Sequence, residues 1–310
     1  MRKFLAAAAI VCTCSSALAQ PVTTITMADP NTFPENVTTL SDGTVILGAM
    51  LTHYIYRARP GQATAERWID LTPVGSASWG LMADNTRNTL WVCTTAFPLP
   101  AKITPPIKER HTTLRAFDTN TGAAKGAYPL LGATNSCNDM TIAANGTVYV
   151  TDIANGNIQR LRPSAAALEP WVGTPELANV DGIAFIGTTL YANNVSTGKL
   201  FRIPINADGS AGAPVEIKLS QPLEGPDGMR AHNGKMYVAE NRGGRASEIT
   251  FSGDTGTVRA LKEGHPSLTG IQPHGDVIWL QQSKQNYWRD PALANANPNP
   301  FVIFSIPTQK

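Results

Sequence analysis

One pattern recurs six times along this chain and restricts its fold more than any other feature. In each copy we expect a loop residue before a short apolar strand, two positions ahead of an aligned apolar position of that strand. Copies at intervals of roughly 40 to 60 residues indicate propeller blades or a helical array. The aligned positions are Val37, Leu81, Met140, Ile183, Met229 and Ile271, and the residues two before them are Glu35, Trp79, Asn138, Asp181, Asp227 and Thr269.

The interior of each copy favours the propeller. The stretch "NDMTIAANGTVYVTDIANGNIQRLRP" contains alternating strands separated by an Asn-Gly turn and another Gly-containing turn, and no stretch has a helical period. The sequence therefore predicts an all-β fold, a six-bladed β-propeller of four-stranded sheets around a central channel. One domain would span residues 20–310. We expect Thr23–Met27 to add the outer strand of the last blade beside Phe301–Ile306, which would leave no open edge.

The N-terminus carries the pattern of a secretory signal. Arg2 and Lys3 precede an apolar stretch that ends in Ala17-Leu18-Ala19. This predicts a signal peptide over residues 1–19, and a secreted or periplasmic protein. The apolar stretch is shorter than the ~20 residues that span a bilayer.

The charge of the chain excludes some partners. The formal net charge is +2, and charge runs are few. Such a chain carries no cluster of positive charges that would bind nucleic acid or a membrane surface. We therefore expect a small-molecule substrate, and the sequence carries no signal for oligomeric state.

The repeated position predicts a metal site. The innermost strands of a propeller run side by side in one direction, so residues at one offset converge at one mouth of the channel. Hard oxygen ligands would come from Glu35, Asn138, Asp181 and Asp227. Such ligands suit a divalent cation, Ca²⁺ above all, whereas zinc prefers His or Cys. Each residue alone is also ordinary turn chemistry. Three converging carboxylates without basic partners would, however, repel one another, and a bound cation relieves this.

Three stretches resemble the senescence-marker-protein, gluconolactonase and luciferin-regenerating-enzyme family of six-bladed propellers. They are "CNDMTIAANGTVYVTD", "VDGIAFIGTTLYANN" and "GPDGMRAHNGKMYVAEN". The resemblance covers most of residues 20–310. It implies a divalent cation, commonly calcium, held by Glu35, Asp181 and Asp227, with Asn138 beside the metal or bound to it.

The resemblance also implies metal-assisted hydrolysis. Asp227, or a water that it orients, would act as base or nucleophile, and Asn138 would position the electrophile. Two positions depart from the family pattern, because Asp181 replaces an Asn and Ser136 replaces an Arg of sugar-lactone relatives. The second change argues against gluconolactone itself.

Further residues are expected around this mouth. Trp79 would form a wall of the pocket. Second strands return to the same mouth, so Asn193 and Glu240 are candidate substrate contacts, although turn chemistry explains them equally well. The same geometry brings Cys93 towards Cys137, which favours a disulfide over two buried thiols.

Two insertions follow second strands on this face. They are the proline-rich Phe97–Thr113, which contains His111, and Ser283–Pro300, which contains Trp288 and Arg289. Both are candidate substrate covers, and loops without function are the alternative.

The sequence thus predicts an exported metal-dependent hydrolase, most closely a lactonase. A non-catalytic, calcium-stabilised propeller that binds a ligand or protein is one alternative. A phosphotriesterase that uses the same site is the other.

Overall fold

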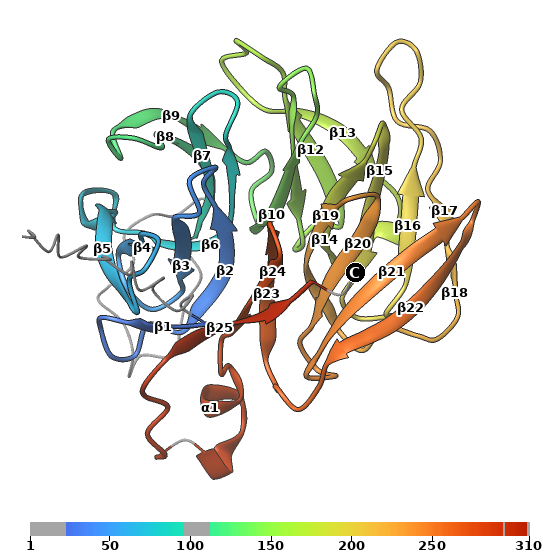
Figure 1. The fold of residues 1–310 in the computed structure, drawn as a ribbon. Helices are drawn as coiled ribbons and strands as arrows, with labels where there is room; N and C mark the ends of the chain where they lie inside the picture. Colours follow the sequence, from blue (N-terminus) through green and yellow to red (C-terminus); the bar gives the residue numbers. More distant parts are fainter. Residues whose placement is uncertain (1–22, 96–111, 294, 309–310) are drawn as a thin grey trace, which may run out of the picture.

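The computed structural model describes residues 23–95, 112–293 and 295–308. These residues form an almost entirely β structure (Figure 1). The helical segments are single turns, α1 (Asn286–Arg289), η1 (Thr72–Val74), η2 (Pro175–Leu177) and η3 (Pro291–Leu293). None of the described helices has the length and apolar character that crossing a membrane requires. The expected signal peptide and residues 97–111 of the first insertion lie outside the described residues.

Each sequence repeat folds into consecutive antiparallel strands. Three separate four-stranded sheets have the orders β6 (Ala77–Asp84), β7 (Thr89–Thr95), β8 (Thr113–Asp118), β9 (Ala124–Pro129); β10 (Cys137–Ile142), β11 (Val148–Asp152), β12 (Asn157–Leu161), β13 (Glu169–Gly173); and β14 (Val180–Ile186), β15 (Thr189–Asn194), β16 (Leu200–Ile203), β17 (Val215–Glu216). A five-stranded sheet has the order β18 (Lys218–Leu219), β22 (Thr255–Lys262), β21 (Arg245–Ser252), β20 (Lys235–Glu240), β19 (Pro226–His232).

The beginning and the end of the chain share one sheet. This eight-stranded sheet has the order β2 (Pro34–Thr39), β3 (Val45–Ala49), β4 (Tyr54–Ala58), β5 (Thr64–Asp70), β1 (Thr24–Met27), β25 (Val302–Pro307), β24 (Val277–Gln282), β23 (Leu268–His274). The expected N-terminal strand is therefore confirmed, since β1 pairs antiparallel with β25 from Thr24 opposite Phe304 to Thr26 opposite Val302. It also pairs in parallel with β5, which the sequence did not indicate.

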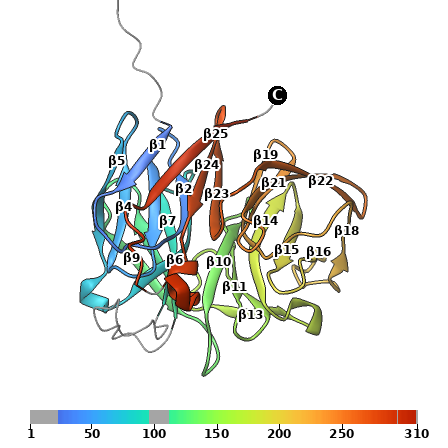
Figure 2. The same ribbon diagram turned by 90° about the horizontal axis from the view of Figure 1, so that it is seen from below.

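The first strands of the repeats form a closed ring. Successive contacts run through β2, β6, β10, β14, β19 and β23, and β23 returns to β2. The colours of Figures 1 and 2 follow the same course, with red β25 beside blue β1. This arrangement is propeller-like, as the sequence predicts.

The apolar core lies between neighbouring sheets. Ile46 and Ile55 of one sheet pack with Leu81 and Leu90 of the next. The aligned apolar position of every repeat has no exposed surface, at Val37, Leu81, Met140, Ile183, Met229 and Ile271. Complete burial of such a side chain stabilises the fold by roughly 1.5–3 kcal/mol, which explains why the repeat keeps this position apolar.

A disulfide joins two adjacent sheets. Cys93 of β7 is bonded to Cys137, the first residue of β10, and this confirms the pairing that the sequence favours. The two residues are 44 positions apart. A bond that closes a loop of this size lowers the conformational entropy of the unfolded chain, and it thereby stabilises the folded state by roughly 4 kcal/mol.

Candidate active site

A β-bulge lies near the start of the first strand of every repeat and determines where the side chains of the site residues point. In β10, Cys137 pairs with Asp152 and Met140 pairs with Val150, so three steps on one strand oppose two on the other. The same shift separates Pro34 from Val37, and it recurs in β6, β14, β19 and β23. The sequence suggested loop residues before each strand. They lie instead inside the first strands, where the extra residue of a bulge re-aims a side chain.

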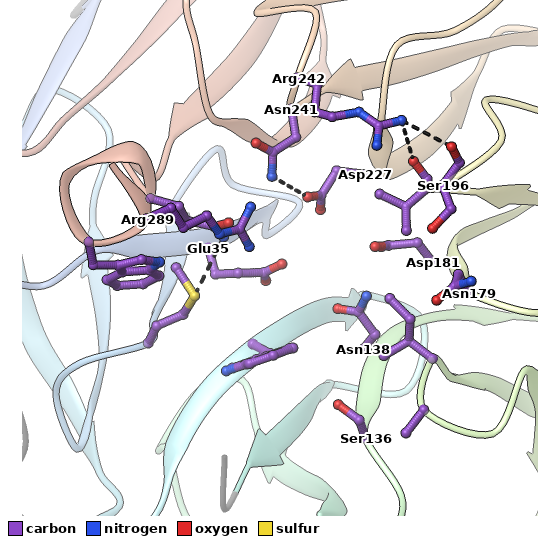
Figure 3. Close-up of a pocket in the computed structure, with 17 residues that line it drawn as sticks. Glu35, Ser136, Asn138, Asn179, Asp181, Ser196, Asp227, Asn241, Arg242 and Arg289 are labelled. Atoms are coloured by element: carbon purple, nitrogen blue, oxygen red, sulfur yellow. Dashed lines mark hydrogen bonds between the residues drawn. The ribbon is translucent and has the colours of Figure 1, made fainter. Parts of the chain in front are cut away.

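The bulges bring most of the predicted site residues into one cavity. This cavity has a volume of about 780 Å³, and the predicted residues in its lining are Glu35, Trp79, Asn138, Asp181 and Asp227. The three carboxylates and the Asn138 amide are only 4 to 7 % exposed. Figure 3 shows them arranged around a common space. Thr269, the sixth residue at this offset, is fully buried and does not line the cavity.

Burial and mutual repulsion make these carboxylates hard to ionise. Burial raises the pKa of Glu35 and of Asp181 well above the usual range, and the charge of Asp227 raises both further. Burial also raises the pKa of Asp227 to about 7. A hydrogen bond opposes this effect, because Asn241 Nδ2 donates to Asp227 Oδ2 over 2.9 Å. Oε2 of Glu35 is buried and has no hydrogen-bond partner among the described residues.

A buried ion pair lies next to these carboxylates. Arg230 Nη1 donates to Asp139 Oδ2 over 2.8 Å, and both side chains are at most 3 % exposed. The other guanidinium nitrogen donates to Asn36 Oδ1 and to the carbonyl of Leu81. Arg230 therefore links four of the strands in the ring, and its charge lowers the pKa of Glu35.

The donor set fits a hard cation. It consists of carboxylate and amide oxygens, which Ca²⁺ prefers. In residues 23–95, 112–293 and 295–308, no three His, Cys, Asp or Glu side chains are gathered as a formed metal site. Burial and the neighbouring carboxyl groups raise the pKa of Glu35 and of Asp181. The unpartnered Glu35 oxygen and the raised pKa values are what a cation would relieve.

Asn193 and Glu240 do not line the cavity. Asn193 is buried behind it, where its Oδ1 accepts from the Gly182 amide over 3.1 Å and its Nδ2 donates to the Asp227 carbonyl over 2.8 Å. Glu240 is fully buried and accepts from Arg245 Nη2 over 2.8 Å. In this structure both side chains are therefore engaged by other groups of the protein.

Asn193 gives a test of how the bulges are held. The substitution Asn193→Leu leaves the Gly182 N–H and the Asp227 carbonyl without partners, and each lost partner costs about 1–3 kcal/mol. We expect the free energy of unfolding to fall by about 2–4 kcal/mol, measured by urea denaturation. Asn120→Leu, a change at an exposed turn residue, should leave it within about 0.5 kcal/mol. Equal stability of the two variants would exclude this role for Asn193.

Several cavity residues lie outside the aligned position of the repeat. Asn241 directly follows β20, and the second insertion supplies Gln285, Trp288 and Arg289. That insertion is held in place, because the rings of Trp288 and Phe33 lie 4.6 Å apart. It therefore forms a wall of the cavity, as expected for a substrate cover. The remaining lining residues are Met50, Ser136, Ile153, Ala154, Asn179, Val195, Ser196 and Arg242.

Comparison by sequence identifies no relative. No protein-family model matches the chain, and no curated protein matches it either.

Comparison by structure finds many propellers. A gluconolactonase from Xanthomonas campestris superposes with a TM-score of 0.62 at 16% identity, covering 91% of this chain and 89% of that one. A luciferin-regenerating enzyme gives 0.65 at 14%, covering 92% and 95%. A calcium-binding protein, regucalcin, from Agrobacterium tumefaciens gives 0.66 at 15%, covering 90% of each chain. The resemblance expected from the sequence is thus confirmed at the level of the fold. Similar structures also include a lyase and a sugar dehydrogenase, so the likeness leaves the reaction open.

Proposed function

We propose that this chain is a six-bladed β-propeller that acts as a metal-dependent hydrolase, and specifically as a lactonase. One observation carries the proposal. Three nearly buried carboxylates, from β2, β14 and β19, meet beside Asn138 in one cavity, and the pKa of each is raised. Perturbed acids in a cleft are typical of catalytic or metal sites. The gluconolactonase and the calcium-binding regucalcin among the similar structures support the same assignment.

The blade count rests on the ring of first strands. These strands, β2, β6, β10, β14, β19 and β23, contact one another in sequence order and close on themselves. The eight-stranded sheet then corresponds to two blades, joined where β1 lies between β5 and β25. Each blade would contribute one residue to the ring at its bulge.

The proposed cation is divalent, with Ca²⁺ preferred. Its ligands would be Glu35, Asp181, Asp227 and Asn138. When bound, such a cation supplies a Lewis acid that polarises a carbonyl and stabilises the developing oxyanion. Asp181 adds a negative charge where the related family has Asn, which should strengthen cation binding.

The protein side chains would carry the proton transfers. Asp227 takes a proton from the attacking water as the water oxygen bonds to the lactone carbonyl carbon. The ring C–O bond then breaks, and the departing oxygen takes that proton. Asn241 fixes the orientation of the Asp227 carboxylate through its hydrogen bond. Asn138 positions the carbonyl group, and Trp79 forms the wall beside it. Ser136 provides no charged group for a polyhydroxy sugar lactone, so gluconolactone is not the expected substrate.

The test is hydrolysis of a lactone panel with and without chelator. The panel contains aliphatic and aromatic lactones, gluconolactone and one phosphotriester. We expect calcium-dependent opening of at least one lactone other than gluconolactone, with loss of turnover in EDTA and recovery on adding Ca²⁺. Turnover of the phosphotriester alone would identify a phosphotriesterase instead. A folded protein that binds calcium but acts on no compound would identify a binding propeller.

We also propose that residues 1–19 direct export. The Cys93–Cys137 disulfide supports this, because disulfides persist mainly in oxidising compartments.

A further inference from the structure

Two arginines line the cavity without a carboxylate partner. Most arginines among the described residues form ion pairs, such as Arg57 with Glu66 and Arg245 with Glu240. Arg242 and Arg289 line the cavity, and neither forms an ion pair with a described residue. The cavity therefore contains two positively charged side chains in addition to the three carboxyl groups.

The two arginines differ in how their guanidinium groups are engaged. Arg242 Nη2 donates to the carbonyls of Val195 and Ser196, each over 3.1 Å, and these bonds tie it to the adjacent loop. The guanidinium of Arg289 makes no hydrogen bond to a side chain or carbonyl of the described residues. Figure 3 shows it pointing into the cavity on the side of Glu35 and Asp227. Arg289 is therefore the guanidinium that is available to a ligand.

The segment that carries Arg289 is fixed against the core. Its neighbour Trp288 packs on Phe33, whose ring centroid lies 4.7 Å from that of Phe301. At the base of the insertion, Lys284 Nζ donates to the carbonyls of Pro298 and Pro300 over 2.6 and 2.9 Å. These contacts hold α1 at the cavity, so Arg289 is presented from a rigid wall.

The lining of the cavity also contains aromatic and apolar side chains. They are Trp79, Trp288 and Met50. A planar or apolar body suits such walls, whereas a guanidinium binds a carboxylate through two parallel N–H···O bonds. The same cavity thus offers a place for a scissile carbonyl, for an apolar body and for an anionic group.

We propose that the substrate is an apolar, preferably aromatic, lactone that bears a carboxylate, and that Arg289 binds this carboxylate. The inference rests on the proposed lactonase function. Arg289 determines specificity here, while Asp227 and Asn138 act on the carbonyl. A lactone without the carboxylate would lack this contact and would be opened less efficiently.

The test compares two lactones that share a ring. Dihydrocoumarin is neutral, and its ring-carboxylated derivatives add the anionic group. With calcium-loaded protein, we expect the best carboxylated derivative to exceed dihydrocoumarin in kcat/KM by about 10- to 100-fold, as for a hydrogen bond to a charged group. Arg289→Gln should remove this advantage mainly through KM, so that the variant opens the carboxylated and the neutral lactone with similar kcat/KM. Arg289→Lys should restore part of it. Arg162→Gln serves as the charge-matched control, because Arg162 is exposed and does not line the cavity.

Two results would overturn the inference. If Arg289→Gln lowers the turnover of both lactones equally and also changes the calcium affinity, Arg289 only balances the charge of Asp227. Equal turnover of the neutral and carboxylated lactones by the parent protein would exclude a carboxylate subsite.

Failure of the lactonase proposal can be recognised separately. If the parent opens neither lactone, calorimetric titration with benzoate and with its neutral isostere benzamide still decides the inference. Preferential benzoate binding that is lost in Arg289→Gln would support the subsite. Equal binding of both compounds, or benzoate binding unchanged in the variant, would overturn it.

Discussion

Replacing Asp227 with asparagine is expected to lower kcat for lactone opening by at least about 10³-fold. Loss of a general base alone costs about 10² to 10⁴ in rate, and this substitution also removes one proposed cation ligand. The shape of the side chain is retained, and Asn cannot ionise against Glu35 and Asp181. The folded protein should therefore keep its stability while it loses turnover. Steady-state kinetics of the parent and variant at saturating Ca²⁺ measure the effect.

Asp84→Asn is the matched control. Asp84 is the last residue of β6, so it stands at the opposite end of its strand from Trp79, and it is as buried as Asp227. We expect its variant to keep parental kcat within about 3-fold. An active Asp227→Asn variant with full turnover would refute the assignment of Asp227 as the base.

Calcium is expected to stabilise the protein strongly at pH 8 and weakly at pH 5. In the folded protein the pKa of Asp227, about 7, lies above the ordinary aspartate value of 3.8. Without a cation, the Asp227 carboxyl of the folded protein is therefore protonated at pH 5. The free energy of unfolding decreases as the pH rises towards 7. Each unit of pKa difference is equivalent to 1.36 kcal/mol. Ionisation of Asp227 alone should therefore lower the free energy of unfolding by about 3 kcal/mol between pH 5 and pH 8. The raised pKa values of Glu35 and Asp181 act in the same direction.

Bound Ca²⁺ relieves this cost, because it binds the ionised carboxylates and competes with protons. Calcium at about 1,000 times its Kd adds about 4 kcal/mol. In thermal unfolding at pH 8, this should raise Tm by about 10 °C. At pH 5 the rise should be less than a third of that. Potassium chloride at equal ionic strength is the control for screening. A calcium effect that is the same at both pH values would show that the three carboxylates do not hold the ion.

Local patterns in the sequence were sufficient for the fold class. Alternating strands and Asn-Gly turns predict the sheets, and complete burial of positions such as Met140 and Ile271 shows that the repeats were aligned correctly. Because each repeat has its own copy of the same strand, the convergence of Glu35, Asp181 and Asp227 also followed from one offset. Since the first strands of all repeats lie next to one another in the ring, the same offset places these residues close together.

Long-range partners could not be found in this way. Arg230 and Asp139 are 91 residues apart, and although each lies next to an aligned position, the repeat does not indicate that they pair. Asn193 was expected to face the substrate, but the bulges turn its amide towards the backbone of Gly182 and Asp227. Arg289 lies in an insertion outside the repeat, so its place in the cavity depends on packing between Trp288 and Phe33. Such contacts arise from tertiary structure and leave no periodic trace in the sequence.

The position of β1 has a consequence for how the chain folds. Its partner strand β25 is separated from it in the sequence by all the other described strands, and Ile25 must find Ile303 across them. Contacts of such sequence separation slow folding, because a very long loop must close first. We therefore expect the pairing of β1 with β25 to be among the last to form during folding, once the sheets between them have brought the two strands together.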